Sequence, residues 1–249
     1  MTEATYFNVR AVGVVRGLEY QLFASIAGFL LSLGIVWYNL GSLVLAYRGD
    51  MDLLGGLPLI ELTKGLVQAG NFFNLAYVIF IVELFLLSFI VWGVENFRTA
   101  RLILGGRSLP MGTDIIRPLT WVGAYLLAIS TIAFLAGAVM LVLIHPYVSL
   151  TVIKLGYILY VTSLILIFSS VVWLLNYLEL SHRPFSLIFS IAIVLHAYSI
   201  LFGFEPNVIA FAVQAGAVLY AYSRSYKRLL EKLGHAAIGE ANVILKNLY

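Results

Sequence analysis

The stretch LTWVGAYLLAISTIAFLAGAVMLVLIH, residues 119–145, runs without a single charged side chain. It is longer than the roughly 20 apolar residues that a helix needs to cross a hydrocarbon layer about 30 Å thick. Backbone amides in lipid must be hydrogen-bonded within their own segment, because no water reaches them there. A run of this length and composition therefore predicts a transmembrane helix.

Working outward from this stretch, further long apolar runs fill most of the chain. They cover residues 20–46, 71–94, 147–178, 184–204 and 206–226. With 62% hydrophobic and 11% charged residues, the chain has too little polar surface to cover a soluble globule. We therefore predict a single all-α integral membrane domain over residues 1–249, built as a bundle of six transmembrane helices.

Basic residues are distributed unevenly around these runs. Of the 15 Lys and Arg residues, those in the termini and in every second connection are Arg10, Arg16, Arg98, Arg101, Arg107, Arg117, Arg183, Arg224, Lys227, Arg228, Lys232 and Lys246. The first connection carries only Arg48 and Lys64. Because Lys and Arg are retained on the cytoplasmic side, this bias predicts a multi-pass cell-membrane protein with both termini in the cytoplasm.

The predicted inner surface is the basic one, and it suits anionic lipid or a cytoplasmic partner. The residues expected to make that contact are Arg98, Arg101, Arg107, Arg117, Arg224, Lys227 and Arg228. A net charge of +3 arranged as a cytoplasmic rim does not indicate a specific nucleic-acid ligand. The expected partners are the lipid bilayer and other membrane-protein subunits or further copies of the chain.

Two connecting segments have helical patterns of their own. Apolar residues recur at near-helical spacing after Pro58, which predicts a short interfacial helix over residues 58–69 in the first outer connection. The tail, residues 227–249, is expected to be an amphipathic extension broken at Gly234. Small residues four apart predict close helix packing; the pairs are Ala24 and Gly28, Ala133 and Gly137, and Ala212 and Gly216.

Four polar side chains lie inside the predicted spans, where they are costly. At ~1.5 Å per residue, Glu83 lies ~18 Å and Lys154 ~10 Å from the outer ends of their spans. His196 and Gln214 both lie ~12 Å from the outer ends of theirs. We predict that these four residues line a polar cavity open to the outside, with Glu83 paired to Lys154.

A structural interpretation of the same residues stays open. Glu83 can be protonated and hydrogen-bonded to a neighbouring helix, and Lys154 can extend its ammonium group toward the outer surface. His196 can be a packing residue, and Gln214 can join helices by hydrogen bonds. Tyrosine hydroxyls would add to either arrangement, and the candidates are Tyr157, Tyr160, Tyr198 and Tyr220.

Several kinds of chemistry are disfavoured by the residues themselves. The chain has no cysteine, and it lacks phosphate-binding, dinucleotide-binding and zinc-protease motifs. His145, His182, His196 and His235 fall at different predicted depths, so a bis-histidine haem is not expected. We predict no catalytic residue, no metal site and no cofactor; the cysteine-free composition is typical of a thermophilic, archaeal-like protein.

Three functions remain compatible with these features. The favoured one is a channel, translocation or scaffold subunit in the membrane part of a larger complex, without enzymatic activity. The second is a small proton-coupled transporter that uses Glu83. The third is a membrane anchor subunit of a respiratory or other redox complex.

Overall fold

The computed structural model describes residues 3–47, 72–104, 116–143, 146–177, 180, 183–203 and 205–246, and all secondary structure in this part of the chain is helical. The helices are α1 (Glu3–Tyr47), α3 (Phe72–Leu104), α4 (Ile116–Leu143), α5 (Pro146–Tyr177), α6 (Arg183–Phe202) and α7 (Glu205–Lys246). Residues 58–69 and Arg107 lie outside the described residues.

Five of these helices are long and apolar enough to cross a membrane. The qualifying segments are Val12–Trp37, Ile79–Leu102, Arg117–Met140, Val148–Asn176 and Arg183–Phe202. This result supports a multi-pass membrane protein, and each of the five segments overlaps one of the six predicted spans.

The predicted sixth span, residues 206–226, forms the first half of α7 but is not among the five. Asn207 and Gln214 lower the hydropathy of this segment, and both are buried inside the bundle. The predicted break at Gly234 is also wrong, since α7 continues to Lys246.

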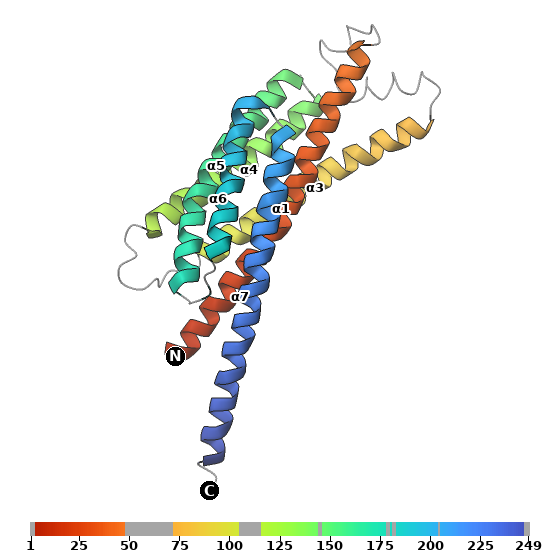
Figure 1. The fold of residues 1–249 in the computed structure, drawn as a ribbon. Coiled ribbons are helices and arrows are strands. Elements are labelled where there is room, and N and C mark those ends of the chain that lie inside the picture. Colours follow the sequence, from red (N-terminus) through yellow and green to blue (C-terminus); the bar gives the residue numbers. More distant parts are fainter. Residues whose placement is uncertain are drawn as a thin grey trace.

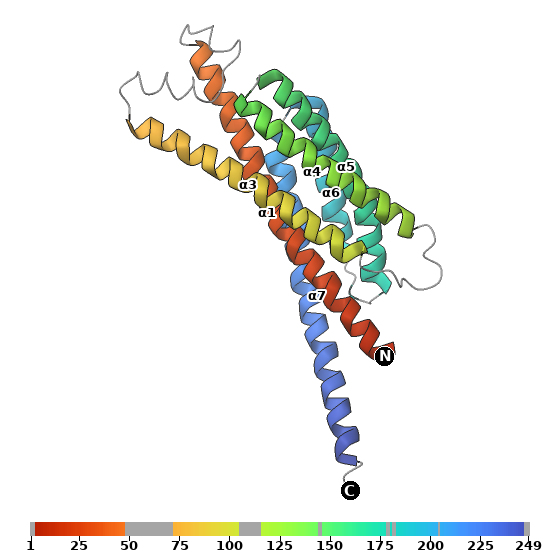
Figure 2. The same cartoon turned by 180° about the vertical axis from the view of Figure 1, so that it is seen from behind.

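The helices pack around α1 and around the α4 and α5 pair (Figure 1). α1 contacts α3 and α7, α6 contacts α7, and α3 also contacts α4. Figures 1 and 2 both show the first half of α3 leaving the bundle and the second half of α7 extending well beyond it. Buried apolar side chains from all six helices form the interior.

Small residues bring α4 and α5 together. Ser130 Oγ donates a hydrogen bond to the Gly156 carbonyl oxygen at 2.8 Å, and Ser149 Oγ donates one to the Gly137 carbonyl oxygen at 2.6 Å. These short hydroxyl-to-backbone bonds require close helix axes, because a serine side chain is short. The predicted close approach at Gly137 is therefore present.

The turn between α6 and α7 sets the position of the polar side chains. Gly203 has a φ of 121°, a backbone conformation that favours glycine. Its amide donates to the Ser199 carbonyl oxygen at 3.1 Å and ends α6, so α7 begins at Glu205. This tight reversal places α6 and α7 side by side and brings His196 opposite Gln214.

Candidate functional site

Gln214 of α7 is the centre of a fully buried hydrogen-bond network. Its amide nitrogen donates to Ser25 Oγ of α1 at 3.0 Å and to the Tyr160 hydroxyl of α5 at 2.9 Å. Its amide oxygen lies 2.7 Å from Nε2 of His196 on α6. One side chain thus joins four helices.

The directions of these bonds fix the tautomer of His196. Because the Gln214 oxygen can only accept, His196 Nε2 carries the proton and donates it. Nδ1 of the same ring then accepts from the Tyr157 hydroxyl, which contacts it. Both ring nitrogens of a neutral imidazole are used, so neither is free to bind a metal ion.

Aromatic rings surround the network. The Phe211 ring lies 4.6 Å from the His196 ring and 5.7 Å from the Tyr160 ring, between centroids. Trp92 of α3 lies 5.2 Å from Tyr160 and 4.6 Å from Phe134 of α4. These rings keep lipid and water away from the polar groups, which strengthens the hydrogen bonds among them.

The other two predicted site residues lie elsewhere. Glu83 of α3 and Lys154 of α5 are both exposed, and no ion pair joins them in the part of the chain that the structure describes. The predicted pair inside one cavity is therefore wrong. In helices that are apolar on every side, sequence gives the depth of a residue but not the direction in which it points.

Some members of the network were not predicted from the sequence. Ser25 belongs to it and Trp92 packs against it, and two of the four candidate tyrosines, Tyr157 and Tyr160, bond directly to His196 or Gln214. Ser25 follows Ala24 and precedes Gly28 by three positions, so the small-residue pattern of α1 was the available signal.

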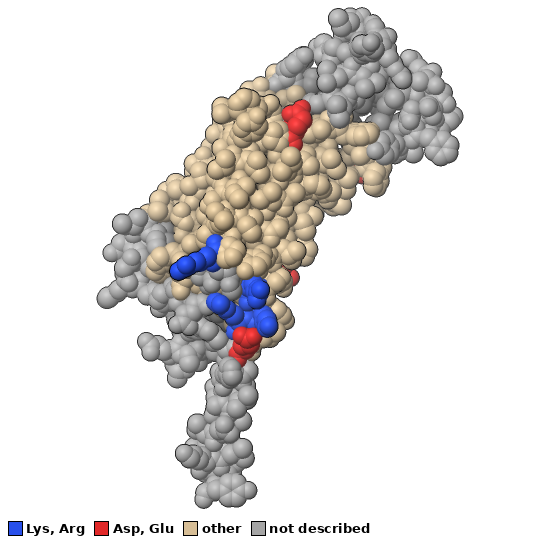
Figure 3. Space-filling view, in the orientation of Figure 1, with Lys and Arg blue, Asp and Glu red and all other residues tan. Residues whose placement is uncertain are grey.

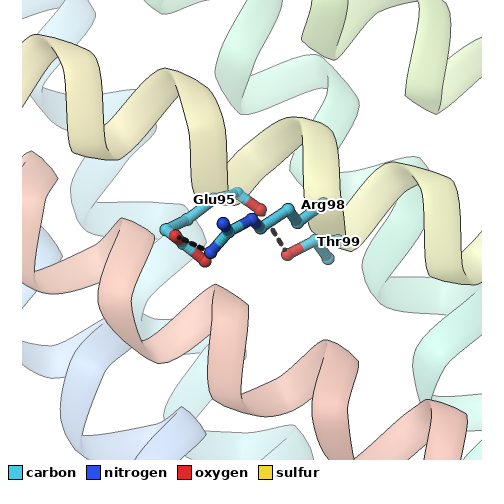
Figure 4. Close-up of polar contacts among 3 residues, drawn as sticks. All are labelled: Glu95, Arg98 and Thr99. Atoms are coloured by element: carbon cyan, nitrogen blue, oxygen red, sulfur yellow. Dashed lines mark hydrogen bonds and ion pairs between the residues drawn. The ribbon is translucent and has the colours of Figure 1, made fainter.

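A second polar cluster lies near the end of α3 (Figure 4). Arg98 Nη1 donates to Glu95 Oε1 at 2.8 Å, and the Thr99 hydroxyl donates to the Glu95 backbone oxygen at 2.9 Å. The Arg98 guanidinium also lies 5.4 Å from the centre of the Tyr20 ring on α1. The cluster links α3 to α1 at the basic end of the bundle.

Apart from Lys154, the basic side chains that the structure describes gather at one end of the molecule. Figure 3 shows Lys and Arg side chains beside the protruding half of α7. Of the predicted contact residues, those that the structure describes are all exposed: Arg98, Arg101, Arg117, Arg224, Lys227 and Arg228. These residues lie in the last turns of α3, the first turn of α4 and the middle of α7. These helix segments are at the same end of the bundle because neighbouring helices run in opposite directions.

Within the described residues, no group of three or more His, Cys, Asp or Glu side chains is placed to hold a metal ion. Comparison with protein-family models, with curated proteins and with solved structures finds no match for this chain. The geometry of the polar groups is therefore the basis for assigning a function.

Proposed function

We propose that this protein is a structural subunit embedded in the membrane part of a larger assembly, with both termini in the cytoplasm and without enzymatic activity. Glu83 carries this proposal. It is exposed on α3 among exposed apolar side chains such as Phe80 and Leu87. A carboxyl group facing lipid is costly, and a neighbouring subunit can provide its partner.

The interior supports a scaffold over a transporter built around Glu83. Gln214, His196 and the tyrosines beside them are fully or almost fully buried and bonded to one another, while Glu83 is exposed and has no hydrogen bond to them among the described residues. A proton-coupled carboxyl group is expected to line the substrate path rather than the outer surface of a helix. A haem-holding anchor is not favoured either, since both nitrogens of His196 are already bonded.

Chemical cross-linking in native membranes tests the proposal. The full chain is cross-linked and then extracted in mild detergent. We expect native mass spectrometry to detect complexes with a mass larger than that of one chain. Glu83→Gln should reduce these species, whereas Glu205→Gln, at an exposed position at the start of α7, should not. Recovery of single chains alone would contradict the proposal.

The orientation has its own test, because the chain contains no cysteine. Single cysteines are introduced in the first connection by Thr63→Cys and in the tail by Asn247→Cys. A maleimide that cannot cross the membrane should label the first variant in intact cells. The second variant should be labelled only after permeabilisation, and the reverse pattern would invert the proposed topology.

A further inference from the structure

Two exposed helix faces each carry one charge among apolar side chains. The face of α3 consists of Ile79, Phe80, Glu83, Leu86, Leu87, Ile90, Val94 and Phe97. The face of α5 consists of Val148, Thr151, Lys154, Leu155, Ile158, Thr162 and Ile165. Both sets recur at three and four residues, so each forms a continuous stripe along its helix.

Counting residues from a shared contact places the two charges at similar levels along the bundle. α3 and α5 run in the same direction, and the Trp92 and Tyr160 rings, 5.2 Å apart between centroids, fix their relative position. Glu83 precedes Trp92 by nine residues and Lys154 precedes Tyr160 by six. At ~1.5 Å per residue the difference is ~4.5 Å along the helices, which long Glu and Lys side chains can span.

Depth matters because subunits in a membrane are related by rotation about an axis along the membrane normal. Such a rotation leaves the depth of each residue unchanged, so two residues can meet across the interface only when their depths agree. Glu83 and Lys154 agree in depth and are opposite in charge. Neither has an ion-pair partner among the described residues of its own chain.

Building on the proposed function, we infer that the partner at the α3 face is a second copy of this chain. Glu83 of one copy pairs with Lys154 of the next, and the apolar stripes of α3 and α5 pack around the pair. Because two different faces meet, the contact is head-to-tail and repeats around a ring. In lipid, an ion pair fixes the partner and its register, while the surrounding apolar side chains supply the packing.

Charge reversal in the full chain, reconstituted in lipid vesicles, tests this pairing. Glu83→Lys or Lys154→Glu places like charges across the interface, and each should abolish assembly. The double reversal, Glu83→Lys with Lys154→Glu, restores opposite charges and should restore assembly. Lys227→Met and Glu205→Gln, which change exposed charges outside both faces, should leave assembly unchanged.

Neutral variants keep the test decisive if a reversed charge prevents insertion. Glu83→Gln and Lys154→Met should each raise the protein density in lipid needed for half-assembly by at least about tenfold, which corresponds to ~1.4 kcal/mol. The double variant, Glu83→Gln with Lys154→Met, should assemble little more weakly than either single variant, because the second substitution removes a charge that already lacks its partner. Additive losses would overturn the pairing.

Cross-linking identifies the contact directly. A Leu87→Cys chain and an Ile158→Cys chain with tags of different size are expressed together and treated with a short bifunctional maleimide; both charges are kept, and each cysteine lies on its face four residues after Glu83 or Lys154. The mixed product should form, and neither variant alone should cross-link. A homo-assembly that lacks the mixed product overturns the pairing and leaves the proposed function standing. A different protein bound to the α3 face would also overturn the pairing and leave the proposed function standing. Recovery of single chains alone would overturn both the pairing and the proposed function.

Discussion

Gln214 and Glu83 are both polar residues within apolar helices, yet the molecule places them in opposite ways. Gln214 is fully buried and reaches partners on α1, α5 and α6. Glu83 is exposed on α3 among apolar side chains. The difference separates a polar group that joins helices within one chain from one that, in the proposed assembly, joins one chain to another.

The comparison makes opposite predictions for the two positions. Changes in the network around Gln214 should lower the stability of the single chain, whereas changes at Glu83 should alter assembly and leave that stability nearly unchanged. Unfolding of the chain in detergent micelles, where copies are separated, measures the first property alone.

The largest effect on stability is expected for Gln214→Leu. The substitution leaves the His196 Nε2 proton and the Tyr160 hydroxyl without their partner in a water-free interior. We expect a loss of about 2–3 kcal/mol in the free energy of unfolding. The measurement is chemical unfolding in micelles.

The matched control is Ser223→Ala on the same helix. The Ser223 hydroxyl is exposed and, within the described residues, bonds to the Leu219 carbonyl oxygen of its own helix at 2.8 Å. Its removal should change stability by less than ~0.5 kcal/mol. Equal effects at Gln214 and Ser223 would show that the network does not hold the helices together.

Glycine substitutions on α1 and α7 should give the next largest effect. A Cβ atom added at Gly28 would collide with the Phe211 ring, which packs against His196. Gly28→Ala should therefore cost about 1–3 kcal/mol in the free energy of unfolding. At Gly216 nothing lies within 4 Å of the added atom, so Gly216→Ala should stabilise the helix by up to ~1 kcal/mol.

These two glycines belong to pairs that look alike in the sequence. Ala24 and Gly28 face a neighbouring helix, whereas Ala212 and Gly216 are exposed on α7. Thermal aggregation midpoints of the two variants should therefore move in opposite directions. A shift of the same sign in both would contradict the packing of α1 against α7.

The sequence predicts how deep a polar residue lies along its helix, but it does not predict whether the side chain points into the bundle or outward. Residue counts along the runs predict similar depths for His196 and Gln214, and the structure joins them at 2.7 Å. The prediction that Glu83 and Lys154 also face inward needed a direction, which the counts do not give, and both are exposed. On a helix that is apolar on every side, no hydrophobic periodicity marks the inner face, so direction is set only by packing.

A smaller loss of stability is expected where a single hydroxyl group links two helices through one hydrogen bond. Ser130→Ala removes the bond to the Gly156 carbonyl oxygen but leaves that oxygen within the hydrogen-bonding of its own helix. We expect a loss of about 0.6–1 kcal/mol in unfolding free energy. Ser169→Ala, which removes an exposed hydroxyl bonded within α5, is the control and should have no measurable effect.

The smallest effect is expected at Glu95, which is intermediate between the two kinds of polar group. Its carboxylate is largely buried, but the side chain of its partner Arg98 is 55% exposed. Water screens an ion pair with one exposed member, so the pair itself contributes little. Glu95→Gln keeps the size of the side chain, and an amide oxygen can still accept from Arg98 Nη1. We expect unfolding free energy to change by less than ~0.5 kcal/mol, with no change in assembly. A loss comparable to that of Gln214→Leu would mean that this cluster, and not only the central network, holds α1 and α3 together.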